Sequence, residues 1–353
     1  MTAYIQSAAA ISPQPTFQAG SFLSDPQQPV KGYFACIHPD YKQFIPTASL
    51  RRMSTIIRMG LSTSMKCLET SGTDSPEAVI IGSGLGCISD TTRFLEQMIH
   101  QGEQMLNPTA FIQSTHNTIA GQIALMLGCK GYNMTFTQKS ISFETALLDA
   151  LLLLEEKRIH NALVGGIDEI TEESFNLKVR TGCVKKWSGG DILNSTDSGA
   201  VAGEGSTSFF LSDRKTTDTL ARIDDLKIIN RCSGLEELQT RLDRFLERNG
   251  LQIGDIDLFI SGRNGDPLES GYHLEMEGRF NNSIVAGYKH LIGEYDTSSA
   301  FGTYLASWIL RNKKVPEAVH LNSVMKDQVG RGLVFNHSKG RDFCFTLVSD
   351  PHV

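Results

Sequence analysis

The chain has 353 residues, of which 40% are hydrophobic and 20% are charged, and it carries a formal net charge of −6 at pH 7. That length suits about two domains, or one large domain with a duplicated core, and the composition is that of a soluble globular protein. The acidic balance argues against non-specific binding to nucleic acid, which requires a basic surface.

The seven cysteines are scattered along the chain, are odd in number and include no CxxC pair. They predict neither a disulfide framework nor a zinc site, and we expect reduced, buried thiols. The apolar run from Ala8 to Ile11 is too short for the core of a signal peptide, and no segment reaches the apolar length of a membrane span. We therefore expect a cytoplasmic protein with no membrane insertion, no metal and no cofactor.

The first third of the chain alternates segments with strand and helix patterns. In chain order these are a strand (Ala3 to Ile5), a loop rich in proline and glutamine, a helix (Arg51 to Ser71), a buried strand (Ala78 to Ile81), a glycine-rich turn (Gly82 to Gly86), a helix (Thr91 to His100) and a proline turn that becomes a helix rich in small residues (Asn107 to Gly128). The strand followed by GSGLG resembles a dinucleotide-binding turn, but its spacing is not GxGxxG, and no acidic residue ends a second strand about 20 residues further on. Tight packing of strand against helix explains these glycines adequately.

The stretch from Met134 to Glu169 organises the rest of the chain. It begins as a strand (Met134 to Thr137), passes through the polar turn Gln138-Lys139-Ser140 and becomes a long apolar helix, after which a second strand (Asn161 to Val164) ends at Gly165-Gly166. A strand, turn and helix in this order normally hold a nucleophile at the helix N-terminus, where backbone N–H groups stabilise negative charge. This turn contains no cysteine.

The remainder of the chain repeats the alternation of strands and helices. The polar segment from Asp213 to Thr219 marks a boundary. Beyond it we expect a strand (Ala221 to Ile229), a helix (Leu235 to Asn249), a strand (Leu258 to Ser261), a helix (Tyr272 to Phe280), a strand (Ile284 to Ala286), an irregular polar segment (Tyr288 to Ala300), a helix (Ala300 to Leu310) and two strands (Gly332 to Phe335 and Phe343 to Val348). The pattern predicts an internally duplicated α/β protein with buried sheets and two halves, 1–215 and 216–353.

Seven segments, in the same order along the chain, resemble motifs of the β-ketoacyl synthases of the thiolase superfamily. They are Ile11-Ser12-Pro13, Asn107 to Gly128, Thr135 to Ala150 at the nucleophile elbow, LVGGIDE (Leu163 to Glu169), Asp197 to Asp213, SGRNGDP (Ser261 to Pro267) and Gly287 to Gly302. Each motif alone is weak, and their order carries a resemblance that spans nearly the whole chain. It implies an α/β, thiolase-like fold with five layers, αβαβα, built from two similar halves.

The same motifs depart from the family at the positions that carry its chemistry. In an active synthase the elbow cysteine is acylated, and two histidines stabilise the developing enolate and oxyanion. The corresponding positions here are Lys139 or Ser140 for the cysteine (with Gln138 as a third candidate), Gly262-Arg263 for the first histidine and Glu294 for the second, while Lys289 matches the family's lysine and His337 to Phe343 replace its gating loop. The site is thus expected to be degenerate, with no catalytic residue.

The resemblance implies a subunit of the chain length factor type. Such a chain would pair with an active ketosynthase, or with itself, meet an acyl carrier protein through that partner and help to shape the acyl tunnel of an aryl polyene, flexirubin-like or aromatic polyketide system. The helix from Asn117 to Gly128 and the strand from Met134 to Thr137 would form the dimer interface. The candidates for tunnel lining are apolar residues, each of which is alone more readily explained as ordinary core: Phe111, Ile112, Met126 and Met134.

Two other hypotheses remain open at this point. One is an acyltransferase or condensing enzyme with altered chemistry, in which Ser140 or Lys139 acts with Glu294, or with Asp296 as a second carboxylate base. The other is a scaffold on the same fold with no acyl ligand. For Glu294 we prefer a structural interpretation, in which an acid paired with Lys289 or Arg263 fills the emptied site.

Overall fold

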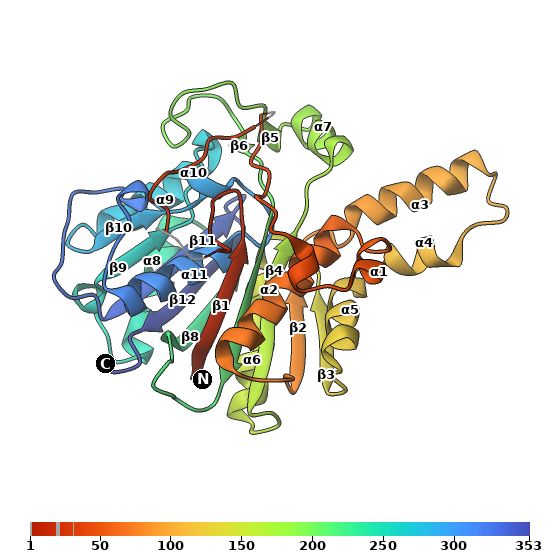
Figure 1. Ribbon diagram of the computed structural model, residues 1–353. Coiled ribbons are helices and arrows are strands. Elements are labelled where there is room, and N and C mark those ends of the chain that lie inside the picture. The colour runs from red at the N-terminus through yellow and green to blue at the C-terminus, as the bar shows by residue number, and fades with distance from the viewer. Residues whose placement is uncertain (1, 19–21, 31) are drawn as a thin grey trace.

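The computed structural model describes residues 2–18, 22–30 and 32–353, and its centre is a ten-stranded sheet made of two five-strand sets (Figure 1). The first set is β1 (Ala3–Ile11), β2 (Ala78–Gly82), β3 (Tyr132–Phe136), β4 (Asn161–Asp168) and β7 (Gly205–Ser212). The second is β8 (Ala221–Asn230), β9 (Leu258–Ser261), β10 (Ile284–Gly287), β11 (Arg331–Ser338) and β12 (Asp342–Ser349). A separate two-stranded sheet pairs β5 (Val184–Lys185) with β6 (Ala200–Val201).

The two sets have the same topology. Their spatial orders are β3-β2-β4-β7-β1 and β10-β9-β11-β12-β8, so in each set the third strand lies at one edge and the first at the other. In each set the second strand is parallel to the third and fourth, and the fifth strand is antiparallel to the fourth and first. The sets join where Ala3–Ile5 pair with Ala221–Ile223. The chain is therefore a structural duplication.

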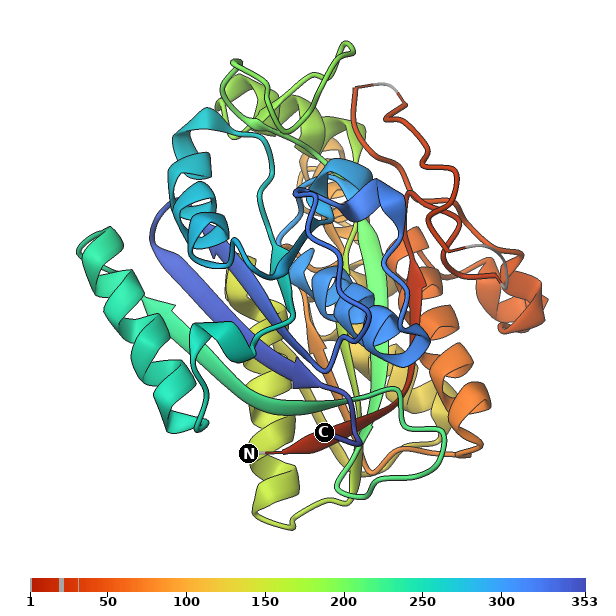
Figure 2. The same ribbon diagram turned by 90° about the vertical axis from the view of Figure 1, so that its left-hand side faces the viewer.

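Helices lie between and outside the two sets. The inner helices are α6 (Ser142–Glu155) and α11 (Ser299–Asn312), which contact each other and strands of both sets. The outer helices are α2 (Thr55–Ser71) and α5 (Thr118–Leu127) over the first set, and α8 (Leu235–Arg248) and α9 (Pro267–Arg279) over the second (Figure 2). One large hydrophobic cluster fills the middle and a smaller one lies under each outer pair. This is the predicted five-layer arrangement.

The sequence accounts for the inner position of α6. Apolar residues occupy nearly every face of this helix, and nine of its fourteen residues are buried. A helix that is apolar all round must be covered on both sides. By contrast, α8 is strongly amphipathic and buries only Leu238, Leu242, Phe245 and Leu246, which suits an outer layer.

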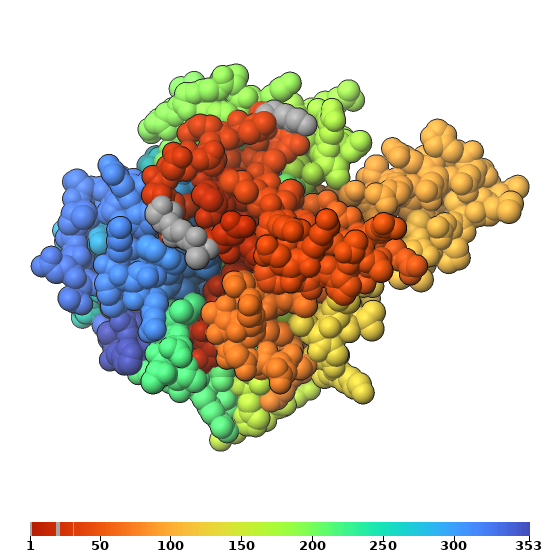
Figure 3. Space-filling view, viewed as in Figure 1, coloured from red at the N-terminus to blue at the C-terminus, as the bar shows by residue number. Residues whose placement is uncertain are grey.

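A helical arm projects from the body of the molecule (Figures 1 and 3). It consists of α3 (Ile88–His100) and α4 (Pro108–Gln113), which contact each other through the rings of Phe94 and Phe111 with 5.5 Å between centroids. The predicted single helix within 107–128 is therefore two helices, α4 and α5. Asn107 caps α4 by accepting a hydrogen bond from the Thr109 backbone N–H, and a turn separates the two helices.

Other predicted elements lie close to those observed and differ mainly at their ends. The helix expected from Arg51 begins at Thr55, and the helix expected from Tyr272 begins at Pro267. β1 continues to Ile11, β4 continues to Asp168, and the segment expected to be irregular contains α10 (Lys289–Ile292). The remaining helices are α1 (Thr47–Leu50) and α7 (Glu172–Arg180). Within the described ranges no helix combines the length and apolarity needed to cross a bilayer.

Candidate functional site

The predicted elbow forms between β3 and α6. Lys139 has a φ of +55°, a left-handed conformation that non-glycine residues rarely adopt. The Ser142 hydroxyl, at the start of α6, braces the turn by donating to the Lys139 carbonyl oxygen (2.7 Å) and to the Ser83 carbonyl oxygen (3.2 Å). Strained backbone of this kind costs about 1–3 kcal/mol and persists where surrounding structure holds it. The elbow geometry is present although its cysteine is not.

A cavity of about 240 Å³ opens at this elbow and gathers side chains from both halves. The predicted residues Lys139, Ser140 and Glu294 all line it. Its other polar lining residues are Lys178, Cys183, Asn264, Asp266, Glu269, Asp296, Ser338 and Lys339. The fold therefore brings the elbow and the second histidine position together, as the sequence predicts for a site shared by two halves.

Glu294 is held by a buried lysine. The Lys289 Nζ lies 3.0 Å from Glu294 Oε1 and 2.8 Å from Oε2, and the Lys289 side chain is only 1% exposed. Glu294 Oε2 also accepts a hydrogen bond from Asn264 Nδ2 at 2.8 Å, and Ser298 Oγ lies 3.4 Å from Oε1. Of the two partners expected for a structural acid, Lys289 is the one that binds Glu294. Both carboxylate oxygens of Glu294 are therefore already engaged by residues of this chain.

The predicted first histidine position lies elsewhere. Arg263 donates from Nε to Glu277 Oε1 at 3.1 Å, and both side chains are about one-tenth exposed. Gly262 lies where a Cβ atom would come within 2.6 Å of Asn336 Oδ1, so the position tolerates little besides glycine. Neither residue lines the cavity; from this segment Asn264 and Asp266 reach it.

Asn264 was missed by the sequence reasoning, although a signal for it exists. The family motif has glycine directly after its histidine, and SGRNGDP contains two glycines that follow a polar residue, Gly262 after Ser261 and Gly265 after Asn264. Gly265 has a φ of +78°, and a Cβ atom at this position would lie 1.9 Å from the Ile192 carbonyl oxygen, so the backbone here requires glycine. Anchoring the motif on this glycine would have selected Asn264 instead of Arg263.

The glycine-rich turn from Gly82 to Gly86 serves the elbow. Asp168, at the end of β4, accepts hydrogen bonds from Ser83 Oγ (3.1 Å) and the Gly84 backbone N–H (2.8 Å) through one carboxylate oxygen. Its other oxygen accepts from the backbone N–H and the hydroxyl of Thr297, both at 2.8 Å. The Gly84 carbonyl oxygen in turn accepts from Lys139 Nζ at 3.2 Å. Close packing requires two of these glycines: a Cβ atom at Gly84 would lie 2.0 Å from Asp296 Oδ2, and one at Gly82 would lie 2.5 Å from the Ser142 carbonyl oxygen.

The cavity is charged, with lysines facing acids. Burial raises the pKa of Asp296 to about 6; the neighbouring Asp168 carboxylate adds to this rise, and Lys178 and Lys139 oppose it. Burial also raises the pKa of Glu269, with a further contribution from the charge of Glu294. A cavity with this lining disfavours an apolar chain and further negative charge.

Comparison with known proteins identifies the fold and the family. A family model described as "Beta-ketoacyl synthase, N-terminal domain" matches residues 26–221, more than half of the chain. The chain belongs to the β-ketoacyl synthase family. A curated family relative, 3-oxoacyl-[acyl-carrier-protein] synthase 2 of Vibrio cholerae serotype O1 (strain ATCC 39315 / El Tor Inaba N16961), is 27% identical over 114 residues. That match covers 31% of this chain and only 26% of the relative.

Solved structures extend the likeness to the whole β-ketoacyl synthase fold. The ishigamide ketosynthase/chain length factor gives a TM-score of 0.80 at 14% identity, covering 99% of this chain and 98% of that one. A β-ketoacyl synthase from Burkholderia phymatum STM815 gives 0.80 at 12% identity, covering 98% of each chain. A chain of AntDE:AntF, a type II PKS acyl-carrier protein in complex with its ketosynthase, gives 0.76 at 14% identity, covering 99% of each. The predicted thiolase-like fold is confirmed.

The described lining of the elbow cavity includes three lysines and four acids. No histidine is found among its described lining residues, and its single thiol, Cys183, comes from the loop after α7 and not from the elbow. Cys183 is exposed, and Cys129 and Cys232 are half-buried, so the expectation of uniformly buried thiols was wrong for these three. They lie in or beside surface turns, which cysteine spacing does not reveal. In the part of the chain that the structure describes, no cluster of potential ligands could hold a metal ion.

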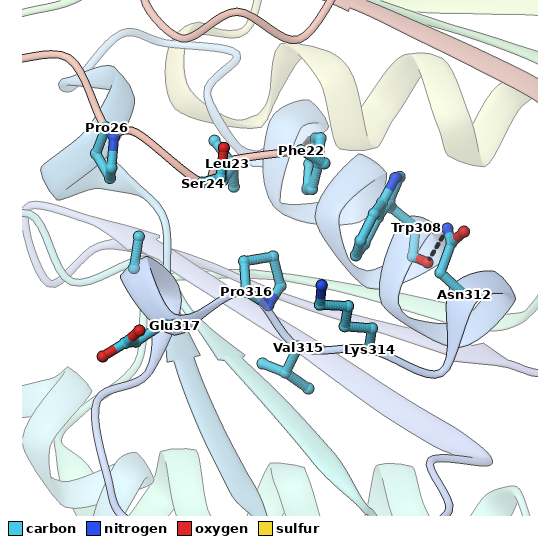
Figure 4. A pocket seen from close by; sticks show the side chains of 11 residues that line it. Phe22, Leu23, Ser24, Pro26, Trp308, Asn312, Lys314, Val315, Pro316 and Glu317 are labelled. Atoms are coloured by element: carbon cyan, nitrogen blue, oxygen red, sulfur yellow. Dashed lines mark hydrogen bonds between the residues drawn. The ribbon is translucent and has the colours of Figure 1, made fainter. Parts of the chain in front are cut away.

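A cavity larger than the one at the elbow lies elsewhere in the described part of the chain. It measures about 760 Å³ and lies between the segment 22–26 and the end of α11, where the ring of Phe22 stacks on that of Trp308 with 4.4 Å between centroids (Figure 4). It shares no residue with the elbow cavity. Cavity size alone would therefore have pointed away from the elbow.

Proposed function

We propose that this chain is a non-catalytic ketosynthase-like subunit of the chain length factor type, which pairs with an active β-ketoacyl-ACP synthase. The observation that carries this proposal is the Glu294 carboxylate, which Lys289 and Asn264 hold in the elbow cavity. Condensation develops negative charge on an enolate and on a thioester oxygen, and enzymes stabilise that charge with preorganised donors. Where such a donor would be needed, this chain has the Glu294 carboxylate, which is a negatively charged hydrogen-bond acceptor.

The residues of the elbow support the same proposal. A thiolate is the nucleophile that a helix N-terminus can activate near neutral pH. Lys139 occupies the strained backbone position and its ammonium is bonded to the Gly84 carbonyl oxygen. Ser140 is nearly buried beside it, and a serine hydroxyl needs an adjacent base to act as a nucleophile. The degenerate positions therefore stabilise the retained fold of the site.

The surface around β3 supports pairing with another subunit. β3 is the edge strand of the first set, and an edge strand presents unpaired backbone groups to a partner. Four apolar residues on α4, α5 and β3 are exposed, by 56%, 60%, 72% and 39% respectively: Phe111, Ile112, Leu125 and Met134. Ordinary core packing within this chain therefore does not explain Phe111, Ile112 or Met134. We propose that they are covered by the partner and border its acyl tunnel in polyene, polyketide or fatty-acid-type biosynthesis.

Co-expression with a Cys-His-His ketosynthase encoded beside this chain tests the proposal. We expect a stable complex by size-exclusion chromatography with light scattering, which Met134→Lys weakens by at least about tenfold because it places a charge in an apolar interface. Met325→Lys is the matched control, since Met325 is 77% exposed in a loop of the second half. An unchanged complex in the Met134 variant would remove this surface from the interface.

The alternative, an acyltransferase or condensing enzyme that uses Ser140 or Lys139 with Glu294, is tested on the same preparation. We expect no covalent adduct by intact-protein mass spectrometry when the isolated chain is incubated with an acyl-carrier thioester. An adduct that disappears in Ser140→Ala or Lys139→Met, together with turnover lost in Glu294→Gln, would favour the enzyme over the subunit.

A further inference from the structure

A second charged pocket lies on the outer layer of the second half, between α8 and β8. It measures about 220 Å³ and is lined by Lys227, Arg241, Arg244, Phe245 and Arg248, which we call the arginine pocket. It shares no residue with the elbow cavity, so the inference below does not depend on the function proposed for that cavity.

The fold brings these cations together from two elements. Arg241, Arg244 and Arg248 follow one another at intervals of three and four residues on α8, which places them on one side of the helix. Lys227 comes from β8, two positions from Asp225, whose carboxylate bonds Arg248 across the same interface. Successive residues at this spacing share one face of a strand. The four positive charges therefore surround one small volume.

The pocket carries more positive than negative charge. Arg241 donates to Glu237 Oε1 from Nε at 2.7 Å, and Arg248 bonds Asp225. In the described part of the chain, neither Lys227 nor Arg244 forms an ion pair with an acid. Four cations thus face two bonded carboxylates in a chain whose formal net charge is −6. The cluster is not a consequence of a basic composition.

The floor of the pocket orients one of its cations. The guanidinium carbon of Arg248 lies 5.4 Å from the centroid of the Phe245 ring, and Phe245 is buried. A guanidinium over an aromatic face is held by a cation–π interaction. Its second partner, Asp225, is also buried. Arg248 is therefore held in place before any ligand arrives, which lowers the entropic cost of binding.

The size and the surroundings of the pocket limit the ligand. Drug-sized ligands occupy pockets of about 300–1,000 Å³, so this pocket suits a single anionic group. Guanidinium groups match phosphoryl oxygens with paired hydrogen bonds. On α8, Glu237 lies among the three arginines, and the acids Glu236, Asp243 and Glu247 lie on another side of the helix. The positive charge of this helix is therefore confined to the pocket and does not form the long basic surface that nucleic acid or a membrane requires.

We propose that the arginine pocket binds the phosphoryl group of a small, soluble phosphorylated molecule. Lys227 and Arg244, which have no acidic partner, supply the charge that the ligand neutralises. Arg241 and Arg248 supply oriented N–H donors. The rest of the ligand extends into solvent, since the pocket accommodates little more than the anionic group.

The test uses the full-length chain and inorganic pyrophosphate, titrated by isothermal calorimetry at about physiological ionic strength. We expect saturable binding, weakened at least about tenfold in the Lys227→Gln/Arg244→Gln double variant, because charge-assisted hydrogen bonds are lost. Arg311→Gln/Lys130→Gln removes the same charge from exposed residues outside the pocket and should bind as the parent does. All variants are checked for an unchanged melting temperature.

Three results would overturn the proposal. The parent chain could fail to bind pyrophosphate at millimolar concentration. The double variant could bind it as tightly as the matched control. The chain could bind vesicles containing phosphatidic acid while giving no response to pyrophosphate, which would assign the pocket to a lipid surface.

Discussion

The pair formed by Lys289 and Glu294 makes a quantitative prediction about stability. In Lys289→Met the glutamate keeps Asn264 and Ser298 as partners but loses its buried cation. Breaking a buried ion pair by removing one partner typically costs about 3–5 kcal/mol. Because the Glu294 side chain is 25% exposed, water from the cavity replaces part of the lost interaction. We therefore expect a loss of about 2–3 kcal/mol in the free energy of unfolding.

The double variant separates the pair from its surroundings. In Lys289→Met/Glu294→Gln no unpaired charge remains, so the loss should be smaller than the sum of the two single losses by at least about 1 kcal/mol. Urea unfolding followed by tryptophan fluorescence and circular dichroism measures all four proteins. Strictly additive losses would refute the reasoning, since they would mean that the ammonium and the carboxylate do not interact energetically.

Three further predictions concern pH and packing. Burial lowers the pKa of His273 well below its usual value and lowers that of His337 to about 3. As pH falls below about 6.5, the two histidines become protonated in the unfolded chain before they do so in the folded chain. The stability that the neutral histidines contribute is therefore complete above that pH and is lost as pH falls toward 3. His337→Gln should flatten the fall in melting temperature between pH 7 and pH 5, and an unchanged slope would contradict this assignment. Asp168→Asn replaces an acceptor of four hydrogen bonds with a group that also donates, and should cost about 2–3 kcal/mol in urea unfolding, against less than about 0.5 kcal/mol for the exposed control Asp197→Asn. Gly166→Ala would place a methyl group 2.8 Å from the Ala300 Cβ and should cost about 1–3 kcal/mol by overpacking; a neutral result would show that α11 can move away from β4.

Much of the architecture could be predicted from local patterns. Leu258 to Ser261 is the strand that its apolar run predicts, and Asn161 begins β4 as expected, because buried parallel strands are short and continuously apolar. The arm was harder to predict, because the helical spacing of apolar residues in 107–128 contains no clear interruption. Only the turn between Gln113 and Thr118 divides it into α4 and α5.

The site was predictable in outline but not in its contacts. Lys139, Ser140 and Glu294 could be brought to one place by the order of motifs alone. Two partners were possible for Glu294, and the choice depends on where the backbone turns. Gly293 has a φ of +77°, and this turn returns the Glu294 side chain onto Lys289. Arg263 pairs with Glu277 because Arg263 follows β9 and Glu277 lies on α9, which packs against β9 on the outer side of the second half. Spacing along the chain does not contain that information.

The position of Asp168 has a consequence for any attempt to divide the molecule. Two of its four hydrogen-bond donors belong to the first half and two to Thr297 in the second. A fragment ending near residue 215 would keep this carboxylate and lose Thr297, together with the helix α11 that covers Gly166. Two fragments split at this boundary should therefore fold only when both are present together. Duplication supplied two similar pieces, but a single carboxylate makes each piece depend on the other.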